Sequence, residues 1–290
     1  MIEYDSRKIL IYLAVKYDGD PFKIINAIRL REDENVPYEE MQKVCDGVKS
    51  KVITYLDKDF PNRLKTMFRP PLVLFYYGDI TLLDDEKRKY AVVGSREYSD
   101  YGEQVTKKLV QEMGRGKILV SGLARGIDTI GHQAALDNKV RTIAVLGSGI
   151  DNCYPEENKE LYERLKKEEL VISEYPNMSE PDKTHFPMRN RLVVALADAV
   201  IVPQINFHVS GTTISVNLAV GSNKPVYVVP HPIFDETVNN DLIQEGANVA
   251  ESGYCLLYVI LRGNCKYLVI QTKLKKLKKL EDYASYKRRN

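Results

Sequence analysis

The stretch "KILVSGLARGIDTIGHQAAL", residues 117–136, holds the pieces of one strand–turn–helix unit. Its apolar residues 118–120 include two β-branched side chains, which favour a strand. Ser121-Gly122 ends this run, and apolar residues at helical spacing begin at Ile127. Arg125-Gly126 therefore stands between a strand and the start of a helix. Ordinary turn chemistry would explain this pair, and so would a site that binds an anion.

The same unit recurs through the middle of the chain, where short apolar runs alternate with helical stretches from Lys89 to about Pro230. The predicted strands are 90–94, 117–121, 142–147, 170–174, 199–203 and 225–229. Nearly continuous apolar strands are typical of a parallel sheet that helices cover on both faces. The sequence therefore predicts an α/β fold with an extended Rossmann-like, doubly wound, mostly parallel sheet. Ligands of such sheets bind at the carboxyl ends of the strands.

Three regions are expected along the chain. Residues 1–68 are predicted to be a helical N-terminal region, because Asp20-Pro21 and Pro37 are helix-start signals. Pro70-Pro71 places an extended entry strand within 69–79, and the Rossmann-like domain is expected to span 69–250. Residues 251–290 are expected to be a C-terminal extension with a basic tail.

Charge is distributed unevenly along the 290 residues, whose formal net charge is +2. Residues 272–290 contain eight Lys/Arg and two acidic residues, a net charge of +6, so residues 1–271 carry about −4. A tail of this kind is usually exposed to solvent. An alternative that stays open is a scaffold protein in which this tail alone recruits nucleic acid or partners.

Several functional classes have no support in the sequence. The acidic N-terminus and the lack of any apolar run near ~18 residues predict a soluble, cytoplasmic protein with no membrane contact. The four cysteines form no CxxC pair, and the four histidines show no ligand spacing, so no metal site or cofactor is expected. No P-loop and no catalytic triad motif occurs.

The loops that follow the predicted strands carry the informative residues. Their glycines let backbone N–H groups approach a ligand, and helix N-termini present unpaired donors. Four arginines lie in or near these loops, and guanidinium groups bind phosphates well. They are Arg96, Arg125, Arg189 and Arg191. This pattern predicts a surface for nucleotide or nucleic-acid phosphates and no catalytic residue. Asp128 is expected to brace its loop.

An ordered series of motifs resembles the DNA-processing protein A family. The motifs are VVGSR (92–96), SGLARGID (121–128), GSGIDNCYPEEN (147–158), SEYP (173–176), FPMRNR (186–191), SGTT (210–213), VVP (228–230) and NDLIQEGA (240–247). Each motif alone is unspecific, but their order is specific, and the resemblance covers roughly residues 54–250. Glu156-Glu157 departs from the family pattern, which often has a basic residue there.

The resemblance implies a Rossmann-like domain that binds single-stranded DNA and helps load the RecA recombinase during natural transformation, commonly as a homodimer. It also implies that the pocket contains the GSR arginine, the glycine-rich loops and the RNR segment. The resulting candidate DNA-binding residues are Gly94, Ser95, Arg96, Ser121, Gly122, Arg125, Gly126, Gly147, Gly149, Tyr154, Asn158, Arg189, Asn190, Arg191, Ser210, Gly211 and Thr212.

One alternative of another class stays open. The same fold includes nucleotide-ligand sensors and phosphoribohydrolase-like enzymes, in which the pocket would hold a small nucleotide. Glu174 would then be a candidate acid/base.

Overall fold

Nine strands form one sheet in the computed structural model, which describes residues 5–252, in the order β1-β2-β6-β5-β4-β3-β7-β8-β9. The strands are β1 (Lys51–Thr54), β2 (Val73–Gly78), β3 (Lys89–Val92), β4 (Ile118–Ser121), β5 (Arg141–Leu146), β6 (Leu170–Ser173), β7 (Ala199–Val202), β8 (Val226–Val228) and β9 (Asn248–Val249). In this order, all neighbouring strands from β6 through β9 are parallel, and β2 is antiparallel to both β1 and β6. The predicted doubly wound, mostly parallel sheet is confirmed.

The chain reverses its direction of winding at β3. From β3 it adds β4, β5 and β6 on one side, then returns to place β7, β8 and β9 on the other. The carboxyl ends of β3 and β7 therefore form the topological switch point, where ligands of such sheets bind.

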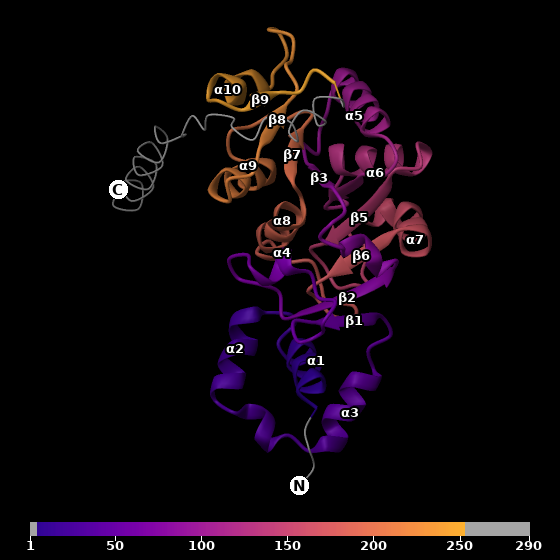
Figure 1. Cartoon of the computed structure of the whole chain (residues 1–290), viewed down its shortest axis with the longest axis vertical. Coiled ribbons are helices and arrows are strands. Elements are labelled where there is room, and N and C mark those ends of the chain that lie inside the picture. The colour runs from indigo at the N-terminus through magenta and orange to yellow at the C-terminus, as the bar shows by residue number, and fades with distance from the viewer. Residues whose placement is uncertain (1–4, 253–290) are drawn as a thin grey trace, which may run out of the picture.

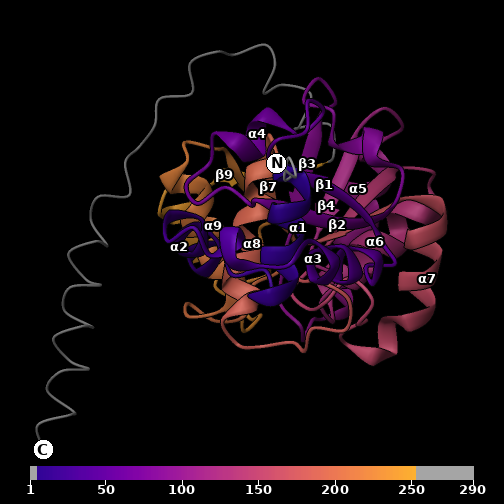
Figure 2. The same cartoon turned by 90° about the horizontal axis from the view of Figure 1, so that it is seen from below.

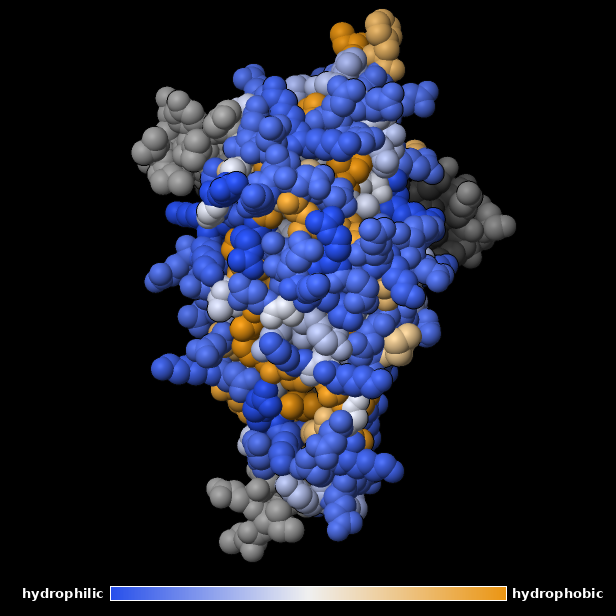
Figure 3. All heavy atoms as spheres, turned by 90° about the vertical axis from the view of Figure 1, so that its right-hand side faces the viewer, coloured by the Kyte–Doolittle hydropathy of each residue, from blue (hydrophilic) through white to orange (hydrophobic). Residues whose placement is uncertain are grey.

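Helices cover both faces of the sheet (Figure 1). The main helices are α1 (Ser6–Lys16), α2 (Pro21–Arg29), α3 (Tyr38–Asp46), α4 (Asn62–Lys65), α5 (Asp100–Met113), α6 (Ile127–Asp137), α7 (Lys159–Glu168), α8 (His185–Leu196), α9 (Gly211–Gly221) and α10 (Asn239–Gln244). Helices α5, α6 and α7 lie on one face, and α4, α8 and α9 lie on the other. The outer side of α5–α7 is mostly hydrophilic, as expected for amphipathic helices at a surface (Figure 3).

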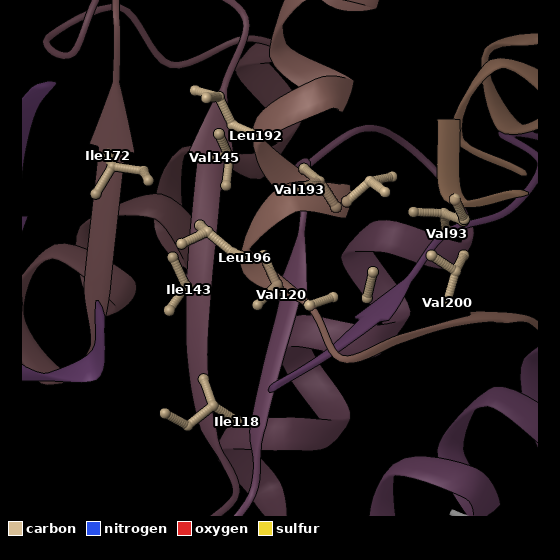
Figure 4. Close-up of a cluster of buried hydrophobic side chains, with 14 of the residues drawn as sticks. Val93, Ile118, Val120, Ile143, Val145, Ile172, Leu192, Val193, Leu196 and Val200 are labelled. Atoms are coloured by element: carbon tan, nitrogen blue, oxygen red, sulfur yellow. The ribbon is translucent and has the colours of Figure 1, made fainter. Parts of the chain in front are cut away.

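Successive side chains of each strand point to opposite faces of the sheet, so each face has its own hydrophobic core. Ile118 and Val120 of β4 pack with α8, whereas Leu119 between them belongs to the cluster under α5 and α6. Figure 4 shows the α8 side, where Leu192 and Leu196 of this helix meet the branched residues of the central strands. Residues buried on both faces explain the continuous apolar strands of the sequence.

The N-terminal helices α1–α3 cover the end of the sheet formed by β1 and β2 (Figures 1 and 2). Asp5 and Asp20 cap α1 and α2 by accepting backbone N–H bonds, as expected for helix N-caps. Residues 51–54, within the region expected to be helical, form β1, which pairs with β2, so this part of the N-terminal region belongs to the sheet.

The predicted C-terminal extension, 251–290, lies outside the described residues apart from 251 and 252, and so does its basic tail. No helix within residues 5–252 is long and apolar enough to cross a membrane.

Candidate nucleic-acid interface

A pocket of about 320 Å³ lies at the carboxyl ends of β3 and β7, where the topology places the switch point. We call it the switch-point pocket. The loops after β3, β4 and β7 and the first turns of α8 and α9 line it. Its predicted residues are Gly94, Ser95, Arg96, Arg189, Asn190, Ser210, Gly211 and Thr212. Residues up to 118 positions apart in the sequence, from Gly94 to Thr212, thus meet at one place.

Arg96 supplies an exposed positive charge at this pocket. Its guanidinium carbon lies 5.9 Å from the centre of the Phe186 ring, which orients the side chain without neutralising it. No salt bridge to Arg96 occurs among residues 5–252. The side chain is therefore available to an anionic ligand.

The N-terminus of α9 forms another wall of the pocket. Ser210 is its N-cap, and the Ser210 hydroxyl accepts the backbone N–H of Thr213 at 3.2 Å. Gly211 and Thr212 follow in the first turn, whose N–H groups have no partner within a helix. These donors and the positive end of the helix dipole favour a phosphate at this wall.

A buried arginine braces the floor of the pocket. Arg189 of α8 donates to the carbonyl oxygens of Gly122 and Val145, at 2.6 Å to the latter. Asp128 accepts the N–H groups of Gly122 at 3.1 Å and Ala124 at 3.4 Å, so it braces its loop as predicted. Burial raises the pKa of Asp128, and the positive charge of Arg189 opposes this shift. Burial also lowers the pKa of the Arg189 guanidinium, and the negative charge of Asp128 opposes that shift.

Gly126 lets two loops approach each other closely. Its φ is +79°, and a Cβ atom there would lie 2.3 Å from the carbonyl oxygen of Ser95. The same oxygen accepts the N–H of Ile127 at 3.2 Å. The start of α6 is therefore covered by the loop after β3. Gly126 serves this packing, and ligand access to α6 is not its role.

The other predicted glycines also allow close packing. A Cβ atom would meet Ile127 at Gly94, Arg189 at Gly122, Phe186 at Gly147, and the 177–179 backbone at Gly149. Gly122 and Gly147 line a small hollow that shares Arg96 and Phe186 with the switch-point pocket. Gly149 lies outside both hollows.

Arg125 and Tyr154 lie farther along the same edge of the sheet. Both line the small hollow, and both also line a wider depression of about 830 Å³. The Tyr154 ring is half exposed and lies 5.7 Å from the Phe186 ring. Arg125 forms an exposed ion pair with Glu157, and both side chains are 62% exposed. The wide depression is acidic, with Asp151, Glu156, Glu157, Glu163 and Glu180 in its lining.

Besides Gly126 and Gly149, three predicted residues lie outside the pockets at this edge and take structural positions. Ser121 is fully buried, and its hydroxyl donates to the carbonyl of Val92 at 2.6 Å. Asn158 is buried and donates to the carbonyl of Leu123 at 3.0 Å. Arg191 makes a buried ion pair with Glu174, in which its Nη2 donates to both carboxylate oxygens at 2.5 and 2.6 Å.

This ion pair corrects two expectations. Arg191 lies outside the switch-point pocket, because its side chain leaves α8 on a different side from Arg189. Glu174 is buried against Arg191 and is absent from the lining of the pocket, so it cannot act there as an acid or base.

Half of the residues that line the pocket were not predicted to bind a ligand, namely Val93, Glu97, Ala124, Asp128, Phe186, Asn206, Phe207 and Ser215. Phe186 stands in the FPMRNR motif and could have been found there. The segment 203–209 carries no motif, so the sequence gives no signal for Asn206 and Phe207. Within residues 5–252, no group of three His, Cys, Asp or Glu side chains could hold a metal ion.

The chain is similar to known proteins in sequence and in fold. The sequence model of the family "DNA recombination-mediator protein A" matches residues 51–259. DNA processing protein DprA of Bacillus subtilis is 36% identical over 249 residues, which cover 84% of this chain and 83% of that protein. The Streptococcus pneumoniae protein of the same name is 40% identical over 204 residues, which cover 70% and 71%.

Two solved structures have the same fold. The X-ray structure of DNA processing protein A from Streptococcus pneumoniae has a TM-score of 0.73 and 34% identity, covering 86% of this chain and 92% of that one. That of the Helicobacter pylori protein, described by its single-stranded DNA binding mode, has a TM-score of 0.66 and 32% identity, covering 73% and 97%. Matches of this extent, in sequence and in fold, show that the chain belongs to the DNA processing protein A family of recombination mediators.

Proposed function

We propose that this protein binds single-stranded DNA without sequence specificity through the switch-point pocket. One observation carries the proposal: exposed Arg96 and the first turn of α9 line the same pocket at the point where Rossmann-like sheets bind ligands. A guanidinium and helix N–H groups both suit a phosphate oxygen. Phosphate contacts hold a strand in place but carry no sequence information.

The size and the surroundings of the pocket favour a single strand. About 320 Å³ is near the lower limit of ligand pockets, so it suits one nucleotide unit. The small hollow next to it continues along the sheet edge to Arg125 and Tyr154. A strand could follow this edge, with neighbouring phosphates at Arg96 and Arg125. The relative from Helicobacter pylori, whose structure is described by single-stranded DNA binding, supports this assignment.

The family of recombination mediators supports a second part of the proposal. The protein would assist the loading of RecA onto single-stranded DNA during DNA uptake, as a homodimer and without catalysis of its own. Two linked DNA sites in a dimer would raise avidity without new contacts. Light scattering should then give twice the mass of one chain, and RecA filaments should form faster on coated DNA when the protein is present.

The decisive experiment measures fluorescence anisotropy of a labelled oligonucleotide at several salt concentrations. Arg96→Ala should weaken binding about tenfold, since it removes a charged contact. It should also reduce the slope of log K against log salt by about 1. The matched control is Arg115→Ala, which removes an exposed arginine between α5 and β4, at the opposite edge of the sheet.

Equal affinities for Arg96→Ala and Arg115→Ala would refute the pocket assignment. Deletion of residues 272–290 tests the scaffold alternative. If the shortened chain keeps a binding component that Arg96→Ala abolishes, the core binds DNA. If the deletion removes all binding, the basic tail is the site.

A further inference from the structure

Phe207 is an exposed aromatic residue on the lining of the switch-point pocket. It follows β7 and stands three residues before the N-cap of α9, with 64% of its surface exposed. A phenylalanine with most of its surface exposed gains little from the hydrophobic effect in the free protein. Its place beside a phosphate-binding wall therefore points to a ligand with an apolar, planar part.

The backbone around Phe207 is anchored to the loop that carries Arg96. The N–H of Asn206 donates to the Ser95 hydroxyl at 2.9 Å, and its side-chain amide donates to the carbonyl of Glu97 at 2.9 Å. On the other side, the Thr213 hydroxyl donates to the carbonyl of Phe207 at 3.3 Å. The ring is thus exposed on a fixed support, so little conformational entropy is lost when a ligand contacts it.

Phe207 differs in this respect from Phe186, the other phenylalanine of the pocket. The Phe186 ring is half-buried between Tyr154, at 5.7 Å, and the Arg96 guanidinium, at 5.9 Å. Phe207 has no ring or cation contact among residues 5–252. Its exposed surface can accept a ring from the ligand without displacing a protein contact.

We infer that Phe207 is a stacking platform for one unpaired nucleobase, next to the phosphate held by Arg96 and the first turn of α9. Every base has a planar face, so stacking adds affinity without sequence preference. In a duplex the same face is covered by neighbouring base pairs, so this contact also favours single strands. The inference rests on the proposed DNA binding and names the part of the nucleotide that Phe207 recognises.

Substitutions at Phe207 can separate stacking from simple apolar contact. Phe207→Ala and Phe207→Leu should both weaken binding of a thymidine oligonucleotide by about 5- to 150-fold, whereas Phe207→Tyr should retain it. The slope of log K against log salt should stay at the wild-type value, because no charge is lost. The matched control is Phe234→Ala, which removes a phenylalanine that is 97% exposed and lies outside the pocket.

An oligonucleotide of abasic sites provides the second probe, because it keeps the phosphates and lacks the bases. Wild type and Phe207→Ala should bind it equally. The chain contains no tryptophan, so Phe207→Trp introduces a single fluorescent reporter. Its emission should be quenched by the normal oligonucleotide and not by the abasic one.

The outcomes distinguish the proposed DNA binding from the proposed stacking at Phe207. If the wild type binds no oligonucleotide, the proposed function fails. If Arg96→Ala weakens binding but Phe207→Ala behaves like Phe234→Ala, only the stacking platform is refuted. Equal quenching by normal and abasic strands would also refute stacking. A Phe207→Ala variant with normal DNA affinity but impaired RecA loading would assign the ring to a protein partner and overturn the inference.

Discussion

Two glycines beside the candidate site have opposite structural roles. Gly126 has φ +79° and lies against the backbone of Ser95 and Arg96, whereas a Cβ at Gly211 would meet no atom within 4 Å. The glycine of the SGLARGID motif is therefore required for the close approach of two loops. The glycine of the SGTT motif leaves the first turn of α9 open.

This difference gives a prediction for protein stability. Gly126→Ala should lower the free energy of unfolding by at least about 2 kcal/mol, because the new Cβ is strained at positive φ and clashes with the Ser95 carbonyl. Gly211→Ala should change it by no more than about 0.5 kcal/mol. Urea unfolding measures both. Equal stability of the two variants would contradict the packing role of Gly126.

A second residue-scale prediction concerns His132 of α6, which is fully buried. Its Nδ1 lies 2.8 Å from the Thr142 hydroxyl, and its Nε2 has no hydrogen-bond partner within the described part of the chain. Burial lowers the pKa of His132 to about 3. The unfolded chain, with an ordinary histidine pKa of about 6.5, binds the proton more tightly.

Stability should therefore be fully present above about pH 6.5 and fall as the pH drops, by about 2 kcal/mol at pH 5 from this group. His132→Asn should remove that part of the loss between pH 7 and pH 5, as measured by urea unfolding at both values. The control is His208→Asn, which removes an exposed histidine 3.0 Å from Asp241. Identical slopes for wild type and His132→Asn would count against this assignment.

At the scale of the elements, the sequence predicts strands better than it predicts which side chains share a site. The central strands are nearly all apolar because both faces are buried, so they are visible without any structural information. The strand β1 lies at the edge of the sheet and is half exposed, so its pattern is weak.

The two arginines of the RNR segment show why the sequence does not predict which side chains share a site. Arg189 and Arg191 are two residues apart on α8, and each residue of a helix turns by about 100°, so both cannot point toward one pocket. Their motif does not say which one faces the ligand. The partners that decide this, Gly122 for Arg189 and Glu174 for Arg191, come from distant parts of the chain. Only the fold brings these partners together.

The Arg191–Glu174 ion pair joins α8 to the loop after β6 and gives a prediction at this scale. Arg191→Met should lower the free energy of unfolding by about 3–5 kcal/mol, because Glu174 is then left buried without its partner. The double variant Arg191→Met, Glu174→Leu should be more stable than Arg191→Met alone, because no unpaired charge remains. Urea unfolding of the three proteins tests this order.

DNA affinity provides a second measurement on the same double variant. Since Arg191 lies outside the switch-point pocket, the folded double variant should bind an oligonucleotide as the wild type does. A tenfold loss of DNA affinity would show that Arg191 belongs to the binding surface.

At the scale of the whole molecule, negative charge increases along the carboxyl edge of the sheet. The lining of the switch-point pocket has two arginines and two acidic residues, whereas the far depression has five acidic residues against one arginine and one lysine. Arg125 lines this depression and forms an ion pair with Glu157. If a DNA strand follows this edge, as proposed, its affinity should be highest at the switch point.

Glu157→Gln should release Arg125 and remove one negative charge from the path of the strand. We expect about a two- to tenfold gain in affinity for single-stranded DNA at low salt, and a slope of log K against log salt steeper by about 1. Glu168→Gln is the matched control, because it breaks another exposed Arg–Glu pair, with Arg164 at the end of α7, away from the pocket. Both are measured by fluorescence anisotropy. If Glu157→Gln and Glu168→Gln change affinity equally, Arg125 is not a DNA contact, and the strand takes another path from the switch-point pocket.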